Sequence, residues 1–158
     1  MFLAAWNGNA EVVKELMNTA DVDLNRSDYE GWTPLQAASH RYAVLEILIQ
    51  EDHNLLQQNL VFFLDLKAFI FLYRGYQNIV GILLKDKRTD VNQADYQGFT
   101  SLIEASFSGM TEVVKLLLTC MDTDIDVSDD NGITALEYAI DRGYADIINA
   151  FESRGAIQ

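Results

Sequence analysis

The sequence predicts an all-α solenoid, a stack of helix–turn–helix units joined by hairpin-like fingers, on the basis of three observations. Gly75, Gly109 and Gly143 stand 34 residues apart, and Gly8 occupies the same place near the start of the chain. Apolar helical segments follow these glycines at 11–17 (EVVKELM), 79–84 (IVGILL), 112–118 (EVVKLLL) and 146–151 (DIINAF). Matching segments recur at 28–38 (DYEGWTPLQAA), 95–105 (DYQGFTSLIEA) and 129–139 (DDNGITALEYA). A period of this length indicates stacked units that share one core, because no unit can bury its apolar face alone.

The period divides the 158 residues into five units within a single domain. The first unit, 1–27, begins inside its own first helix, because Met1 stands where the leucine of the motif is expected. Helices are therefore expected at about 2–7 and 10–17. Phe2 and Leu3 offer no polar cap, so both a natural start and a fragment of a longer array remain open. The remaining units are expected at 28–60, 61–94, 95–128 and 129–158.

The second and third units depart from the pattern. In the second unit, Gly31 suits a turn with positive φ, Thr33 can cap the following helix, and Pro34 fits its first position. The segment 37–43 (AASHRYA) then breaks the motif, so we expect a tight or irregular turn before a helix at 44–49. The third unit has lost its finger motif, and bulky residues replace the small alanines of its first helix. Those bulky residues either fill a thicker core or form an apolar surface at 60–73 for docking or self-association.

The fourth and fifth units return to the pattern. The fourth unit, 95–128, is regular throughout. The second helix of the fifth unit carries Asp146, Asn149 and Glu152. Polar residues on the outward side are what the terminal unit of a solenoid requires, so 129–158 is expected to be a C-terminal cap.

These segments resemble the ankyrin-repeat family. The resemblance rests on D-x-x-G-x-T-P-L at 28–35, weaker copies at 95–102 and 129–136, the V-V-K-x-L-L helix, and D-V-N at 90–92. It covers nearly the whole chain and implies an ankyrin-repeat solenoid with β-hairpin-like fingers. Members of the family mostly bind other proteins, with partners that differ from member to member. The resemblance also implies that Asn92 is a candidate substrate of an asparaginyl hydroxylase.

Composition narrows the class of partner and the compartment. The chain has a net charge of −13 and 49% hydrophobic residues, which indicates a globular protein with an acidic surface. No basic stripe is present to bind nucleic acid, and anionic membranes are disfavoured. The most apolar run, 60–73, contains Asp65 and Lys67 and is too short to span a bilayer. A single cysteine, Cys120, and the lack of a leader segment favour an intracellular protein, cytoplasmic or nuclear.

No residue pattern points to catalysis, a metal or a cofactor. His40 and His53 lack the spacing of a zinc site, and neither a nucleophile motif nor a phosphate-binding loop is present. The acidic stretch 122–130 (DTDIDVSDD) resembles a calcium loop, but the required glycine is missing in both possible frames, and the frame from Asp122 also lacks the closing glutamate. We therefore expect a protein that is not an enzyme.

A ladder of aromatic and acidic residues is the strongest functional feature. In the ankyrin resemblance these positions face the concave groove, and tyrosine and tryptophan dominate binding hot spots. Glu104 is expected on the acidic rim of the same face, which would suit a segment rich in arginine or lysine. The competing interpretation is that some of the rings pack onto neighbouring fingers as structure. The candidate partner-binding residues are Trp6, Tyr29, Glu30, Trp32, His40, Tyr73, Tyr96, Phe99, Phe107, Asp130 and Asp141.

The sequence therefore predicts a protein-interaction module that binds a protein or basic peptide on its concave face. Two alternatives remain open. One is an assembly role through 60–73, and the other is the targeting arm of a larger regulatory or enzymatic polypeptide.

Overall fold

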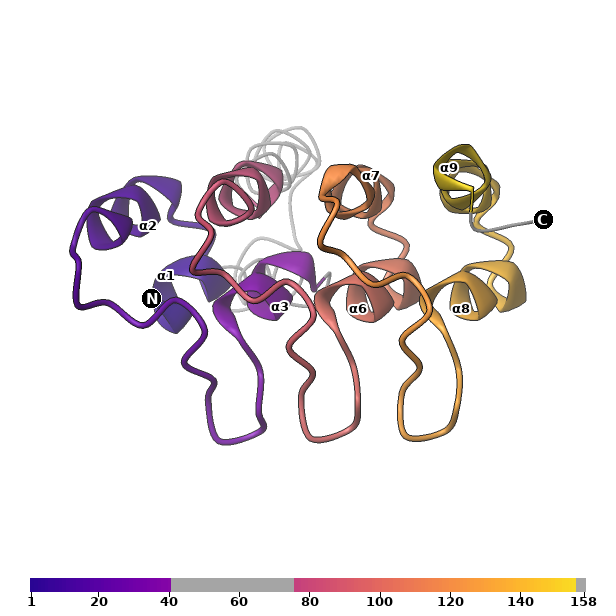
Figure 1. The fold of residues 1–158 in the computed structure, drawn as a ribbon, viewed down its shortest axis with the longest axis horizontal. Helices are drawn as coiled ribbons and strands as arrows, with labels where there is room; N and C mark the ends of the chain where they lie inside the picture. The colour runs from indigo at the N-terminus through magenta and orange to yellow at the C-terminus, as the bar shows by residue number, and fades with distance from the viewer. Residues whose placement is uncertain (41–75, 156–158) are drawn as a thin grey trace, which may run out of the picture.

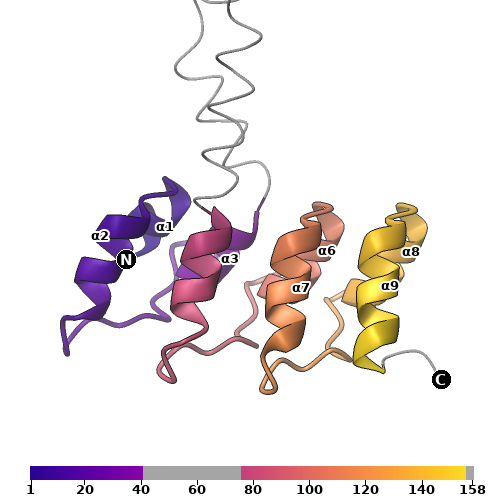
Figure 2. The ribbon, with the colours of Figure 1, turned by 90° about the horizontal axis from the view of Figure 1, so that it is seen from above.

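The computed structural model describes residues 1–40 and 76–155, and it shows two rows of short helices above a row of fingers (Figures 1 and 2). We call the helices beside the fingers the inner row and the others the outer row. Apart from an isolated bridge between Ser128 and Thr134, the described residues form helices, turns and loops. The predicted all-α solenoid is confirmed. The inner row is α1 (Phe2–Trp6), α3 (Pro34–Ser39), α6 (Ser101–Phe107) and α8 (Ala135–Asp141). The outer row is α2 (Ala10–Met17), the helical segment 76–83, α7 (Thr111–Thr119) and α9 (Ala145–Arg154).

Each inner helix after α1 begins at a threonine cap, as expected for Thr33. The Thr33 Oγ1 accepts a hydrogen bond from the Gln36 backbone nitrogen at 3.2 Å, and the Gln36 side chain accepts one from the Thr33 nitrogen at 2.7 Å. Pro34 stands in the first turn, as predicted. Thr134 and Glu137 make the same reciprocal pair at α8, whereas at α6 the Thr100 side chain accepts from the Ile103 nitrogen alone. The caps satisfy amide groups that have no partner inside the helix.

One aspartate closes each finger. The Asp28 Oδ1 accepts hydrogen bonds from the backbone nitrogens of Glu30 and Trp32, both at 2.9 Å. Asp95 and Asp129 make the same pair of bonds in the next two fingers. The same hydrogen bonds therefore fix the turn at the tip of each finger.

The contacts of α3 give the stacking order of the described helices. Helix α3 packs directly against both α1 and α6. The fingers are neighbours too, because the Tyr96 backbone nitrogen donates to the Glu30 carbonyl oxygen at 3.4 Å. Among the described residues, α3 and α6 are therefore neighbours in the inner row, and so are the fingers that begin at Asp28 and Asp95.

The segment 76–83 takes the place of the outer helix in the layer of α3. Tyr76 donates its hydroxyl to the Trp6 carbonyl oxygen at 2.6 Å, and its ring lies over Gly8. Tyr144, at the start of α9, lies over Gly109 in the same way. Since α9 belongs to the unit directly after α7, the repeat of this contact places 76–83 in the unit directly after α2.

Contacts at the other end of the same helices agree with this register. Arg88 donates to the carbonyl oxygen of Met17 at 2.9 Å, at the end of α2. Asn25 bridges the next loop, donating to the Arg88 carbonyl oxygen at 2.6 Å and accepting from the Asp90 nitrogen at 2.7 Å. Helix α3 and segment 76–83 thus share one layer, although residues 40–75 lie between them in the chain.

Several predictions fall on 41–75, outside the described residues. They are the irregular turn and the helix at 44–49, the bulky first helix of the third unit, the apolar run 60–73, and the candidate Tyr73. For this part of the chain the division into five units stays a prediction.

A continuous apolar core runs between the two rows and through all layers. Ala5, Leu35, Leu102 and Ala135 contribute from the inner row, and the outer row contributes Val13, Ile79, Val113 and Ile147, all of them buried. In the ranges 1–40 and 76–155 the structure contains no helix that is long and apolar enough to cross a membrane.

Candidate protein-binding face

The N-terminal aromatic cluster consists of Phe2, Trp6, Trp32 and His40. Trp32 and His40 meet edge to face with ring centroids 4.7 Å apart, and Trp6 lies 6.1 Å from Trp32 and 6.2 Å from His40. Phe2 stacks on Trp6 at 6.0 Å. Three of the predicted residues therefore come together, from α1, the finger and the end of α3. All four rings are half-buried, because they cover one another and keep one side toward solvent.

The C-terminal aromatic cluster consists of Phe99, Phe107 and Tyr138. Phe107 lies 5.9 Å from Phe99 and 5.2 Å from Tyr138, in both cases edge to face. Such T-shaped pairs match the positive edge of one ring to the negative face of another. The guanidinium of Arg142 lies over the Phe107 ring, 3.7 Å from its centroid. The predicted anchors Phe99 and Phe107 are therefore brought together, and they pack as structure as well as facing solvent.

A buried polar link joins the two clusters. His40 Nδ1 pairs with the Glu104 carboxylate, which also accepts a hydrogen bond from the Ser108 hydroxyl at 2.9 Å. Nearby, the Gln36 side chain donates to the Phe99 carbonyl oxygen. These contacts tie α3 to α6 across the layers. They also correct one expectation: Glu104 is buried, so it belongs to this link and not to an exposed acidic rim.

The finger tips carry the most exposed candidates. Tyr29 is 85% exposed and Tyr96 74% exposed, on neighbouring fingers. Glu30, Asp130 and Asp141 are also exposed, as predicted for acidic groups around a binding surface. The coulombic effect of Glu30, whose side chain also accepts a hydrogen bond from the phenol, raises the pKa of Tyr29. The tips therefore combine tyrosine rings with carboxylates that are free to contact a partner.

Tyr138 and Arg142 were missed by the sequence reasoning. Burial and the hydrogen bond to Asp129 raise the pKa of Tyr138 to about 12, and its hydroxyl donates to the Asp129 Oδ2 at 2.7 Å. Tyr138 stands four residues after its capping threonine, as Glu104 does, and both reach back to the preceding layer. The shared position after the threonine cap could have identified Tyr138 from the sequence. The helix pattern alone, however, does not say which positions of a helix contact the preceding layer.

Carboxylates next to the fingers are perturbed in opposite directions. Burial, together with the charges of Glu104 and Asp130, raises the pKa of Asp95 despite its backbone hydrogen bonds. Burial also acts to raise the pKa of Asp129, but hydrogen bonds from Ile133 and Tyr138 outweigh it and lower that pKa. Asp129 therefore keeps its negative charge next to the Tyr138 hydroxyl.

Asn92, the candidate hydroxylation site, has its side-chain amide engaged at both ends. It donates to the Asp122 carbonyl oxygen at 2.7 Å and accepts from the Asp124 nitrogen at 2.8 Å. Asn25 makes the equivalent bridge one layer earlier. A modifying enzyme would have to open these bonds, and the modification stays a prediction.

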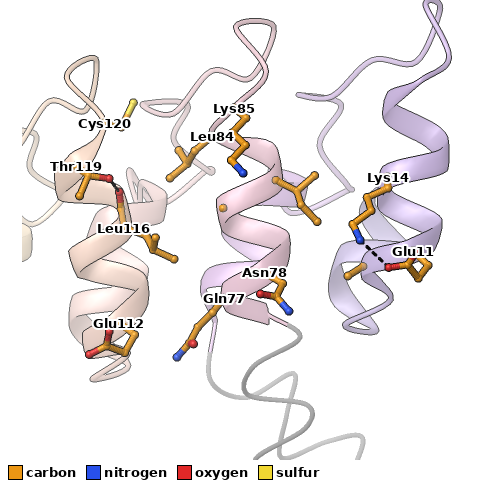
Figure 3. Close-up of a pocket in the computed structure, with 13 residues that line it drawn as sticks. Glu11, Lys14, Gln77, Asn78, Leu84, Lys85, Glu112, Leu116, Thr119 and Cys120 are labelled. Carbon is orange, nitrogen blue, oxygen red and sulfur yellow. Dashed lines mark hydrogen bonds and ion pairs between the residues drawn. The ribbon is translucent and has the colours of Figure 1, made fainter.

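The outer row contains an open cavity of about 810 Å³ between α2, 76–85 and α7 (Figure 3). Among its charged lining groups, Lys14 pairs with Glu11 at 2.7 Å, and Glu112 pairs at 2.7 Å with Lys115, which stands outside the lining; Lys85 lines the cavity as well. The half-buried Cys120 lies at its edge with a free thiol. Within the described ranges, no group of three His, Cys, Asp or Glu side chains is placed to hold a metal ion.

Comparison with known proteins identifies the stack. A family model described as ankyrin repeats, in three copies, matches residues 1–61 and 69–156. Among solved structures, the chain is similar to one in the crystal structure of the yeast ribosomal protein Rps3 in complex with its chaperone Yar1. That similarity has a TM-score of 0.62 and 17% sequence identity, and it covers 99% of this chain and 91% of that chain. No curated protein sequence matches.

Proposed function

This chain belongs to the ankyrin-repeat family, and from that premise we propose that it binds a basic protein segment along its inner row and fingers. We call this surface the inner face: the two aromatic clusters and the finger-tip residues Tyr29, Glu30, Tyr96 and Asp130. The observation that carries the proposal is the exposure of Tyr29 and Tyr96 on adjacent fingers that are bonded to each other. The proposal assigns binding to the chain and no chemical reaction.

Physical chemistry favours rings of this kind as anchors. Tyrosine supplies a large contact area at a small cost in side-chain entropy, and it is enriched in the residues that dominate binding energy. Neither Tyr29 nor Tyr96 is needed to fill the core, since most of each side chain is exposed to water. The half-buried rings of the two clusters add a rigid floor beside the tips.

Charge favours a basic partner. The chain carries a net charge of −13, Glu30 and Asp130 lie exposed on the inner face, and Asp141 is exposed at the end of α8. A field of one sign speeds the approach of an oppositely charged segment and excludes acidic competitors. The association should therefore weaken as salt rises, because exposed charges are screened over about 10 Å at 0.1 M.

The comparisons support binding at the coarser level. The similar yeast chain comes from a structure of a ribosomal protein with its chaperone, in which two proteins are bound to each other. At 17% sequence identity, the similarity indicates a shared fold and does not indicate a shared partner. Ankyrin repeats are common in intracellular proteins, and we propose that compartment for this chain.

The proposal is tested by affinity capture from cell lysate, with wild type, Tyr29→Ala/Tyr96→Ala and Met121→Ala as bait. Met121 is 83% exposed and lies at the end of the outer-row helix α7, so its variant controls for loss of an exposed apolar side chain. At 0.15 M salt, we expect wild type and Met121→Ala to capture the same basic proteins and Tyr29→Ala/Tyr96→Ala to lose them. At 0.5 M salt, all three baits should lose these proteins. Equal retention by all three baits would contradict the proposal. Circular dichroism should first confirm equal helix content.

A further inference from the structure

In this acidic protein, which we propose binds a basic segment, the Arg142 guanidinium already occupies the face of the Phe107 ring. Arg142 is the exposed C-cap of α8, yet its guanidinium lies 3.7 Å from the centroid of the Phe107 ring, which belongs to the preceding layer. Phe99 and Tyr138 stand edge-on to the same ring. The equivalent positions in the first and third layers carry Asn7 and Ser108, so stacking of the repeats does not itself require an arginine.

The surroundings of this contact are negative. Asp129 binds the Tyr138 hydroxyl, and both Asp129 and Glu104 act on that phenol electrostatically, with Arg142 opposing them. Asp141 is exposed one residue before Arg142. The face of an aromatic ring carries negative charge density, and carboxylates around it add to the attraction for a planar cation.

We infer that Phe107 and Tyr138 form a guanidinium subsite, which Arg142 fills in the free protein and an arginine of the partner fills in the complex. The inference rests on the proposed function, and it names the partner residue and the place where it docks. Arginine is favoured over lysine because a planar guanidinium stacks on a ring, whereas an ammonium group is a compact and strongly hydrated charge.

The exchange costs little. A cation–π contact at an exposed site changes an equilibrium by about two- to fivefold. Arg142 remains exposed, and its backbone nitrogen donates to the Tyr138 carbonyl oxygen at 3.1 Å, so the side chain can swing away while the helix end stays fixed. Arg142 therefore acts as a weak internal competitor, and its removal should strengthen binding.

The test uses the full chain and two probes, acetylated and amidated hexa-arginine and hexa-lysine, titrated by calorimetry at 0.15 M and 0.5 M salt. Arg142→Gln removes the competitor. Lys85→Gln removes the same charge from an exposed site on the opposite, outer row, and so controls for net charge. We expect Arg142→Gln to bind hexa-arginine about two- to fivefold more tightly than Lys85→Gln does. The gain should be smaller for hexa-lysine and should persist at high salt.

A second measurement needs no substitution in the core. In wild type, the side-chain NMR signals of Arg142 should be displaced by the Phe107 ring and should return toward ordinary values as hexa-arginine is added. Equal affinities of Arg142→Gln and Lys85→Gln, or Arg142 signals that stay displaced at saturation, would overturn the subsite. If Tyr29→Ala/Tyr96→Ala still lost affinity for hexa-arginine in that case, the proposed inner face would stand. Hexa-arginine that failed to bind any of the proteins would contradict both proposals.

Discussion

A Cβ atom on Gly98 would lie 2.8 Å from the backbone nitrogen of Asp130 in the next finger, closer than such atoms approach in proteins. The same relationship holds one layer earlier, where a Cβ on Gly31 would lie 2.9 Å from the Tyr96 nitrogen. Gly98 also has a φ of 81°, a backbone conformation that residues other than glycine rarely adopt. The fingers are thus stacked at backbone contact, and this spacing sets the distance between their tip residues.

We predict that Gly98→Ala destabilises the protein more than Gly132→Ala does. Both glycines have positive φ, but a Cβ on Gly132 would meet nothing within 4 Å. Gly132→Ala should therefore cost only the backbone strain of about 1 kcal/mol. Gly98→Ala adds a clash with the next finger, which has to move away. Urea unfolding measures both, and equal losses of stability would show that finger contact is not the constraint.

Ser106→Ala should stabilise the protein by about 1 kcal/mol, since a buried hydroxyl without a hydrogen bond is unfavourable. The Ser106 hydroxyl is fully buried in α6 and has no hydrogen-bond partner among residues 1–40 and 76–155. Ser39 stands at the same position of α3, is equally buried, and donates to the Leu35 carbonyl oxygen at 2.8 Å. Ser39→Ala is therefore the matched control and should not stabilise. A thermal melt in which the two variants shift the midpoint equally would refute this explanation.

Asn92→Ala should destabilise the protein by about 1–2 kcal/mol. The change removes two hydrogen bonds between adjacent loops, one to Asp122 and one from Asp124. In the described part of the chain, the Asn131 side chain donates its hydrogen bond to Asp129 in its own finger, at 3.2 Å, so Asn131→Ala should cost less. Chemical unfolding of both variants checks the order. If Asn131→Ala proved the more damaging, the loops would be held together by other contacts.

The loop after segment 76–83 should lose stability in acid. A hydrogen bond from Arg88 lowers the pKa of Asp86 from 3.8 to about 2. Because the pKa is lower in the folded state, the pair stabilises the fold above about pH 4, and this contribution is lost as the pH falls toward 2. Asp86→Asn should thus lower the melting temperature at pH 6, and the difference from wild type should narrow between pH 4 and pH 2. A difference that stayed constant over this range would exclude Asp86 as its source.

Periodicity predicted the fold well, because turns and caps depend on local chemistry. Gly31 takes a φ of 87°, and Thr33 and Pro34 start α3, as those residue types dictate. Counting along the chain does not give the neighbours within the stack. Helix α3 meets α6 directly, although a further period of sequence separates them, because stacking follows complementary surfaces and not distance along the chain.

The candidate face was predicted only in part, because spacing along the chain does not show which residues the stack brings together. Spacing identified Tyr29 and Tyr96 as candidate partner-binding residues because each follows a finger aspartate. It could not foresee that Glu104 is buried against His40, since that pairing joins residues 64 positions apart. Arg142 escaped notice for the same reason, because only the stack brings it over Phe107.

Photo-crosslinking tests the central claim most directly. A photoreactive amino acid would replace Tyr96 on the inner face or, as a control, Lys85 on the outer row, in the full chain exposed to cell lysate. We predict that basic proteins are crosslinked from position 96, that 0.5 M salt abolishes the products, and that position 85 yields none of them. Crosslinking of the same proteins from both positions, or from position 85 alone, would contradict a partner that binds the inner face.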